Sequence, residues 1–132
     1  AAMKPNMRWV PWHAEWRAHH RCYTPLAARA TDVFFYGAVT RHYPLRQQLH
    51  SVLTAANATD RLRVDFLSHP GYHHIDDTVR RTGAALYARI GAAKLTVMTS
   101  LSYDYMVNKH VEVPVAGGVM LGEPGTQAGG DV

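Results

Sequence analysis

Three charged side chains fall close together in the stretch SLSYDYMVNKHVEVPVAGGVMLGEP, which covers residues 100–124. Asp104 and Glu112 are eight positions apart, and Lys109 lies between them. Within one continuous helix the two carboxylates would share a similar side but lie about 12 Å apart. With Asp104 in a loop and Glu112 near the helix end, both could accept hydrogen bonds from one extended polar ligand. The spacing alone leaves a simpler interpretation open, namely surface charges on an amphipathic helix.

A second candidate segment is YGAVTRHYPLR, residues 36–46. Gly37 follows an apolar run, and a helix is predicted to begin near Tyr43. The free backbone N–H groups and the positive dipole end of such a helix form an anion site. Arg41, in the loop before the helix, would add a positive charge. The alternative is that Gly37 is only a turn residue and Arg41 only a solvated side chain.

A third segment, SHPGYHH, carries histidines close to two aspartates further along the chain: His69, His73, His74, Asp76 and Asp77. Histidine and carboxylate side chains are metal ligands in principle. Adjacent histidines in a Pro-Gly loop are more often exposed loop residues, and no second ligand group has the spacing of a metal site. We therefore expect no metal here.

Strand-like and helix-like segments alternate from residue 32 onward. Continuous apolar or β-branched runs predict strands at 32–39, 63–69, 94–100 and 117–124. Helical spacing predicts helices at 43–57, 76–93 and 104–113, the last stopped by Pro114. This alternation implies a parallel sheet with right-handed crossovers. We expect an α/β fold, a Rossmann-like three-layer domain with a parallel sheet of about four strands.

The domain boundaries follow from the same pattern. Residues 1–31 have no sustained period and are expected to form a linker or N-terminal arm, residues 32–124 the Rossmann-like domain, and residues 125–132 a flexible glycine-rich tail. In open parallel sheets, ligands bind outside the carboxyl ends of the strands. Each of the three polar segments follows a predicted strand, so we expect all three to reach that one edge.

Composition narrows the class of protein. The chain has 132 residues, of which 47% are hydrophobic and 18% charged, so one packed domain is expected. The net charge of +4 favours anionic ligands. Nucleic acid is a weaker candidate, because the arginines are dispersed and no binding motif is present. A single cysteine, Cys22, excludes an internal disulfide, and no apolar run is long enough for a membrane span. A cytoplasmic location is the resulting expectation.

Two segments, DVFFYGAVTRHYPLRQQL and YARIGAAKLTVMTSLSYDYMVNKHVEVPVAGGVMLGEP, together resemble the C-terminal half of a GT-B glycosyltransferase. The likeness is to the group of proteins similar to the spore maturation protein CgeB. It covers roughly residues 32–124, and NKHVEVPVAGG is its most specific part. The resemblance implies a domain that binds a nucleotide-diphosphate sugar as glycosyl donor, without a metal ion or other cofactor.

The resemblance also implies roles for the charged residues of the first segment. Glu112 matches the glutamate that binds the nucleotide ribose, and Asp104 falls on the position that reaches the donor sugar. Lys109 matches a lysine close to the diphosphate. It is expected, with Arg41, to stabilise the charge on the departing nucleoside diphosphate. Gly37 and Thr40 are expected in the loop that approaches the phosphates.

The same resemblance implies that the chain is incomplete as an enzyme. The acceptor site of such enzymes lies largely in an N-terminal Rossmann half, which would be supplied by a missing domain or by a partner chain. We therefore expect a glycosyltransferase fragment with little activity alone. The alternative is a non-catalytic α/β module that binds a nucleotide or a protein. Trp9, Trp12 and Trp16 would suit docking against a partner.

Overall fold

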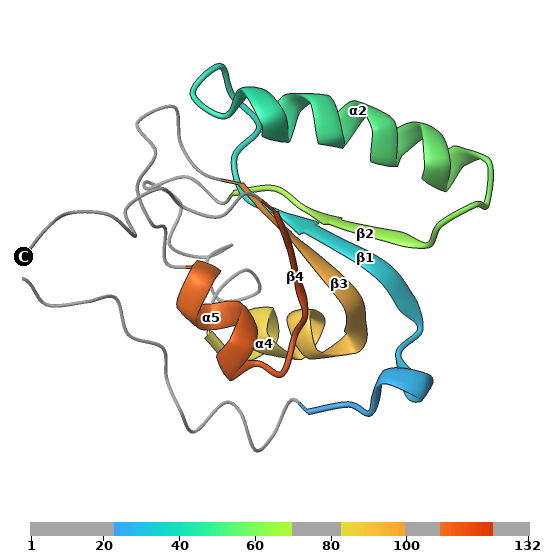
Figure 1. Ribbon diagram of the computed structural model, residues 1–132, viewed down its shortest axis with the longest axis vertical. Coiled ribbons are helices and arrows are strands. Elements are labelled where there is room, and N and C mark those ends of the chain that lie inside the picture. The colour runs from blue at the N-terminus through green and yellow to red at the C-terminus, as the bar shows by residue number, and fades with distance from the viewer. Residues whose placement is uncertain (1–22, 70–82, 100–108, 123–132) are drawn as a thin grey trace, which may run out of the picture.

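The computed structural model describes residues 23–69, 83–99 and 109–122. Strands and helices alternate along these ranges, as the sequence predicts (Figure 1). The elements are η1 (Leu26–Ala28), β1 (Thr31–Tyr36), α2 (Pro44–Ala58), β2 (Val64–Leu67), α4 (Gly83–Ala92), β3 (Ala93–Met98), α5 (Lys109–Val115) and β4 (Met120–Gly122). Within the described ranges, none of the helices has the length and apolarity needed to cross a membrane.

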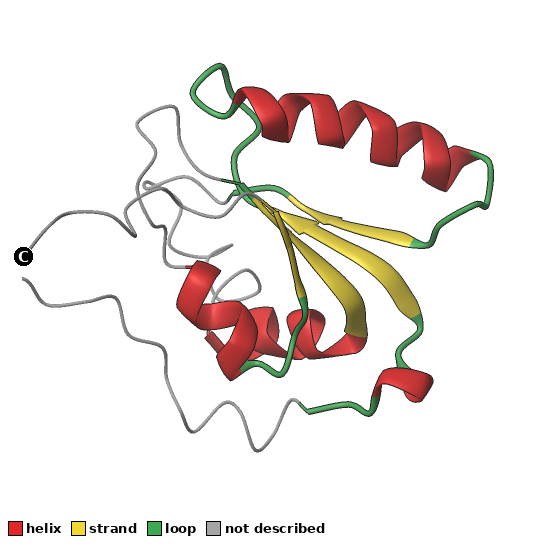
Figure 2. Ribbon diagram, in the orientation of Figure 1, coloured by secondary structure: helices red, strands yellow, loops and turns green. Residues whose placement is uncertain are grey.

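The four strands form one parallel sheet in the order β2-β1-β3-β4. Helix α2 covers one face of the sheet, and α4 and α5 cover the other (Figures 1 and 2). The chain leaves β1 toward β2 and later returns to β3 on the other side of β1, so the strand order reverses between β1 and β3. The predicted Rossmann-like α/β domain with a parallel sheet of four strands is confirmed.

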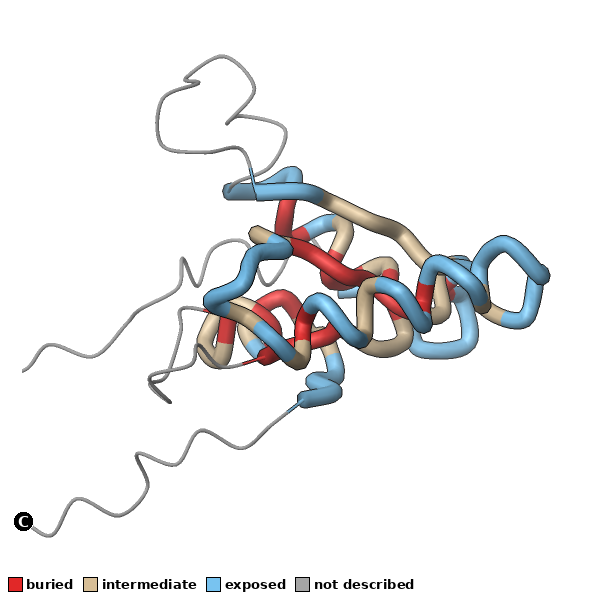
Figure 3. The backbone as a smooth tube through the Cα atoms, turned by 90° about the horizontal axis from the view of Figure 1, so that it is seen from above, coloured by how far each residue is buried: buried red, intermediate tan, exposed pale blue. Residues whose placement is uncertain are grey.

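Strand β1 is buried on both faces, which explains its continuous apolar sequence. Val33 and Phe35 pack toward α2, in a cluster with Leu53 and Val97. Phe34 and Tyr36 alternate with them and point to the opposite face. There they form a cluster with buried residues of α4 and α5, which are Leu86, Tyr87, Ile90 and Val113, with Ala116 directly after α5, and with Ala93 of β3. Figure 3 shows exposed positions along most of α2 and buried positions behind it.

Helix α2 begins where the sequence predicts. Tyr43 precedes it, and Pro44 occupies its first turn, where a missing N–H costs no intrahelical hydrogen bond. At its other end the Asn57 side-chain oxygen accepts a hydrogen bond of 2.9 Å from the Val64 backbone N–H. This hydrogen bond joins the end of α2 to the start of β2, so a polar contact holds the helix on the sheet in addition to the packing of its apolar face.

The predicted stop of the last helix at Pro114 is wrong, because α5 includes this proline and continues to Val115. The helix ends instead in a Schellman motif. Gly117, with φ of +72°, donates to the Pro114 carbonyl, and Gly118 donates to the Val113 carbonyl. Pro114 lacks a donor, but its carbonyl is still used by the cap. The glycine pair is therefore the actual stop signal.

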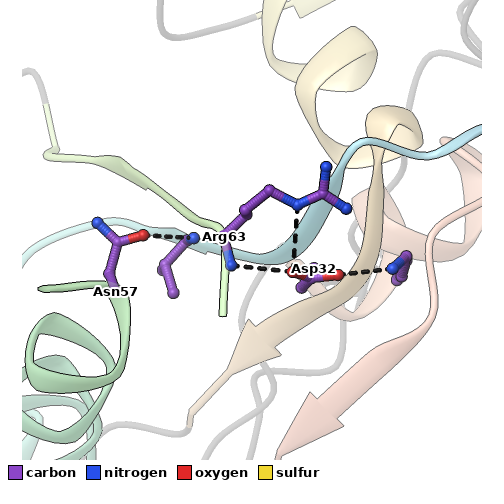
Figure 4. Close-up of polar contacts among 5 residues, drawn as sticks. Asp32, Asn57 and Arg63 are labelled. Atoms are coloured by element: carbon purple, nitrogen blue, oxygen red, sulfur yellow. Dashed lines mark hydrogen bonds and ion pairs between the residues drawn. The ribbon is translucent and has the colours of Figure 1, made fainter. Parts of the chain in front are cut away.

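At the amino ends of the strands, Asp32 joins three neighbouring strands (Figure 4). Its carboxylate accepts hydrogen bonds of 2.6 Å from Lys94 Nζ and 2.9 Å from the Arg63 backbone N–H, with Arg63 Nε at 3.5 Å. The hydrogen bond from Lys94, followed by that from Arg63, holds the pKa of the Asp32 carboxyl well below its usual range. This charged group secures the sheet edge opposite to the predicted ligand edge.

The described part of the N-terminal arm is attached to the domain by Arg29. This buried side chain donates from Nε to the Thr24 carbonyl at 2.8 Å, from Nη1 to Ala93 at 2.9 Å and from Nη2 to Gly117 at 2.8 Å. Arg29 therefore connects the arm to the start of β3 and to the turn after α5.

Candidate anion-binding site

The loop between β1 and α2 starts at Gly37, at the carboxyl edge of the sheet. Gly37 has φ of +108°, a conformation that favours glycine, and its N–H donates to the Leu67 carbonyl at 2.9 Å. A Cβ atom at this position would lie 2.9 Å from Lys109 Nζ and 3.1 Å from Arg46 Nη1. Glycine is required here both for the turn and for the close approach of two cations.

Arg46 lies in the first turn of α2, and only 4% of it is exposed. Its guanidinium donates to Thr99 Oγ1 at 2.8 Å, to the Thr99 carbonyl at 3.1 Å and to the Ala38 carbonyl at 3.0 Å. The guanidinium carbon also lies 3.8 Å from the centre of the Tyr43 ring. Since Ala38 follows β1 and Thr99 follows β3, Arg46 joins the two strand ends where the strand order reverses. Burial lowers the pKa of Arg46, but arginine remains charged in proteins.

Lys109 is the first residue of α5 and is 9% exposed. Its Nζ donates to the Tyr36 carbonyl and lies 3.8 Å from the centre of the Tyr36 ring. Burial and the neighbouring Arg46 charge lower the pKa of Lys109 well below its ordinary value of 10.5, while Glu112 acts in the opposite direction. The structure thus holds a lysine with a disfavoured charge beside a permanent cation.

The two cations converge on one point. Because both nitrogens lie within 3.1 Å of the Cβ position at Gly37, their separation cannot exceed twice that distance. Two unit charges roughly 6 Å apart repel by about 3 kcal/mol at an effective dielectric constant of about 20. The ion pairs of Asp32 are with Arg63 and Lys94, and that of Asp65 is with Arg89, while Glu112 is the carboxylate whose charge acts on Lys109.

The start of α2 adds to the positive potential. Its first turn contains no acidic residue, and its orphan N–H groups carry the positive end of the helix dipole. Helix N-termini and arginine forks both match phosphate oxygens in geometry. The arrangement of Arg46, Lys109 and the α2 start is therefore suited to an anion, and to a phosphate group in particular.

Glu112 lies beside this site on α5. Its carboxylate accepts a hydrogen bond of 3.1 Å from the Tyr36 hydroxyl. Burial, and then the Glu112 charge, raise the pKa of Tyr36, so the hydroxyl remains a neutral donor. Tyr36 therefore contacts Lys109 through its ring and backbone carbonyl, and Glu112 through its hydroxyl.

The structure also describes two of the remaining predicted residues, Thr40 and Arg41. Thr40 and Arg41 are exposed in the same loop as Gly37, and Thr40 Oγ1 accepts from the His42 N–H at 3.4 Å. Asp104 lies outside the described residues. The structure therefore brings Gly37, Lys109 and Glu112 together around Tyr36, and leaves Arg41 on the surface of the loop.

The histidine segment is described only in part. His69 is exposed after β2, whereas His73, His74, Asp76 and Asp77 lie outside the described residues. Among the described residues, no three or more histidine, cysteine, aspartate or glutamate side chains are grouped so that they could hold a metal ion.

Sequence reasoning missed Arg46, which is the most extensively hydrogen-bonded side chain of the site. Its signal is periodicity, since Arg46 precedes Leu49 and Leu53 by three and seven positions and so shares their buried face. Arg46 has the helical spacing of the apolar face and lies in the first turn after a glycine-containing loop. This combination predicts a buried cation near the end of a strand.

Comparison of the chain with protein-family models, with curated proteins and with solved structures gives no match.

Proposed function

We propose that this domain binds the phosphates of a nucleotide-diphosphate sugar and serves as the donor half of a GT-B-type glycosyltransferase. The observation that carries the proposal is the convergence of the Arg46 and Lys109 nitrogens beside Gly37. Their position outside β1 and β3, where the strand order reverses, is the usual ligand position in open parallel sheets.

The chemistry that this arrangement supports is departure of a nucleoside diphosphate. During glycosyl transfer the bond between the sugar carbon and the phosphate oxygen breaks, and its electron pair stays on that oxygen. Arg46, Lys109 and the α2 start would stabilise the charge that develops there. Arg41, exposed in the same loop, is proposed to approach the phosphates from solvent.

The proposed contacts of the rest of the donor follow the sequence resemblance. Glu112, whose carboxylate accepts from the Tyr36 hydroxyl, is proposed to bind the ribose hydroxyls. Asp104 is proposed to reach the sugar. The acceptor and any general base would come from an N-terminal Rossmann half or from a partner chain. The chain alone is therefore expected to bind the donor and to turn over little.

Calorimetric titration with UDP, GDP and ADP tests the donor site. Arg46→Met and Lys109→Met should each weaken nucleoside diphosphate binding about 10- to 100-fold, because each removes charge-assisted hydrogen bonds. Arg63→Met is the matched control, since Arg63 carries the same charge but is exposed at the opposite edge of the sheet.

Equal loss of affinity in Arg63→Met would mean that only net charge matters. Absence of binding to all three nucleotides by the folded domain would overturn the proposed function.

A further inference from the structure

We infer that the anionic group of the ligand enters this site together with one proton, which the Lys109 amine takes up. In the ligand-free protein Lys109 is a neutral amine, and in the complex it is an ammonium. The inference deepens the proposed function and depends on it, because it concerns how the same anion site is loaded.

Among the described residues, the groups that face Lys109 Nζ come from β1, α2, α4, α5 and the residue after β3. Strand β1 contributes the Tyr36 ring and carbonyl, and α2 contributes the Arg46 guanidinium. Helix α5 contributes Glu112, and α4 contributes Tyr87, whose hydroxyl acts on Tyr36 rather than on the lysine. After β3, the Thr99 hydroxyl accepts from Arg46. Among these described groups Glu112 is the one anion, and its carboxylate accepts from Tyr36.

This environment disfavours a second cation. Lys109 is 9% exposed, so water solvates an ammonium there poorly. Arg46 remains charged at all accessible pH values. Its Nη1 lies 3.1 Å and Lys109 Nζ 2.9 Å from the same Cβ position at Gly37, so the two nitrogens are close neighbours. A neutral amine retains the hydrogen bond to the Tyr36 carbonyl, because it is still a donor. Burial and Arg46 accordingly lower the pKa of Lys109.

A bound anion reverses this balance. A doubly charged phosphate or sulfate beside Arg46 and Lys109 outweighs the single guanidinium charge, and an opposite charge within about 4–6 Å favours the ammonium. The amine then gains one proton from solvent, with no other bond made or broken. Because binding takes up a proton, the affinity for the anion should fall as pH rises. The fall can reach tenfold per pH unit between the pKa of Lys109 in the ligand-free state and its higher pKa in the bound state.

Calorimetry with sulfate as the probe measures this proton directly. Sulfate keeps one protonation state across the neutral and alkaline range, so any proton taken up belongs to the protein. Titrations at one pH in buffers of different ionisation enthalpy should give an uptake close to one proton per sulfate. Lys109→Arg should bind sulfate with no uptake, and Lys94→Arg, a change at the opposite edge, should keep the wild-type uptake.

A second measurement covers the case in which arginine does not fit at position 109. The Lys109 Cε resonance, assigned by its loss in Lys109→Met, should titrate at a higher pH with sulfate than without it. Sulfate or UDP binding without proton uptake and without a shift of this midpoint would overturn the inference and leave the proposed function standing. Unchanged uptake in Lys109→Arg would assign the proton to another group and overturn the inference. Failure of both sulfate and nucleoside diphosphates to bind would overturn both proposals.

Discussion

Gly37 decides whether the two cations of the site can meet. Its left-handed φ allows the chain to turn from β1 into the loop, and its missing Cβ leaves the position that Lys109 Nζ and Arg46 Nη1 approach. A substitution of Gly37 therefore combines backbone strain with displacement of the Lys109 and Arg46 side chains. Gly83 also has a positive φ but has no atom close to its Cβ position, so a substitution there causes backbone strain alone.

Gly37→Ala should lower both stability and anion affinity. The added methyl would lie 2.9 Å from Lys109 Nζ, so the lysine must move. Nucleoside diphosphate affinity should fall about tenfold, because the bound anion loses one charged contact. Gly83→Ala is the control, because Gly83 has φ of +55° and nothing within 4 Å of its Cβ position. Both variants should lose about 1 kcal/mol or more of unfolding free energy, measured in urea.

The anion titration distinguishes the two glycines. Gly83→Ala should keep the wild-type affinity despite its strain. Wild-type affinity in Gly37→Ala would show that the Lys109 position beside Gly37 is unimportant for binding.

At the scale of elements, the sheet is stabilised at both ends by arginine and lysine side chains. Arg46 joins the ends of β1 and β3 at the carboxyl edge, while Lys94 and Arg63 meet Asp32 at the amino edge. The two edges differ in their acceptors, because Arg46 uses a hydroxyl and carbonyls, whereas the amino edge has a carboxylate.

Asp32→Asn should destabilise the domain most at neutral pH. The pKa of Asp32 is lowered from 3.8, so its stabilising effect is present above that pH and is lost as pH falls through the lower folded value. The wild type and the variant should therefore converge in acid, and added salt should reduce their difference at pH 7. Urea unfolding from pH 7 to pH 2 measures this.

Asp60→Asn is the control, because Asp60 is exposed and asparagine tolerates its φ of +53°. A constant difference between the Asp32→Asn variant and the wild type across this range would contradict an ionic role.

Element order and sheet direction could be predicted because each depends on local pattern. The apolar run of 32–39 and the spacing of Leu45, Leu49 and Leu53 distinguish a doubly buried strand from a helix with one apolar face. The stop at Pro114 was wrong because a helical cap depends on which carbonyls the later N–H groups use, and Gly117 and Gly118 decide that.

The candidate site was only partly predictable for a different reason. Lys109 and Glu112 were proposed from resemblance, and Gly37 from its place after a strand. The contact of Arg46 with Thr99 joins residues 53 positions apart, and no local pattern reports such a pairing. Whether Asp104 belongs to the site stays a prediction, since it lies outside the described residues.

For the whole molecule, the site links charge, stability and ligand binding. The chain has a net charge of +4. Among the described residues the buried cationic side chains are Arg29, at the start of β3, and Arg46 and Lys109, which lie together where the strand order reverses. A buried lysine with a lowered pKa means that the ligand-free folded protein binds fewer protons than the unfolded chain. Stability should therefore depend on pH in the alkaline range.

Unfolding free energy in the absence of anions should rise with pH between the lowered folded pKa of Lys109 and its ordinary value of 10.5. The unfolded chain holds the extra proton in this window, so the slope can reach about 1.4 kcal/mol per pH unit. Tyr36 has the opposite effect on the unfolding free energy, but only above pH 10.0, its ordinary pKa. Its pKa is raised in the folded protein, so the stability that it adds is present at lower pH and is lost as pH rises toward the folded pKa. Urea unfolding from pH 7 to pH 10, in wild type and Lys109→Met, isolates the lysine. Lys109→Met should remove the part of the pH slope that Lys109 causes, and saturating sulfate should flatten the slope of the wild type. Parallel curves of unfolding free energy against pH for the two proteins would show that Lys109 remains an ammonium in the ligand-free domain.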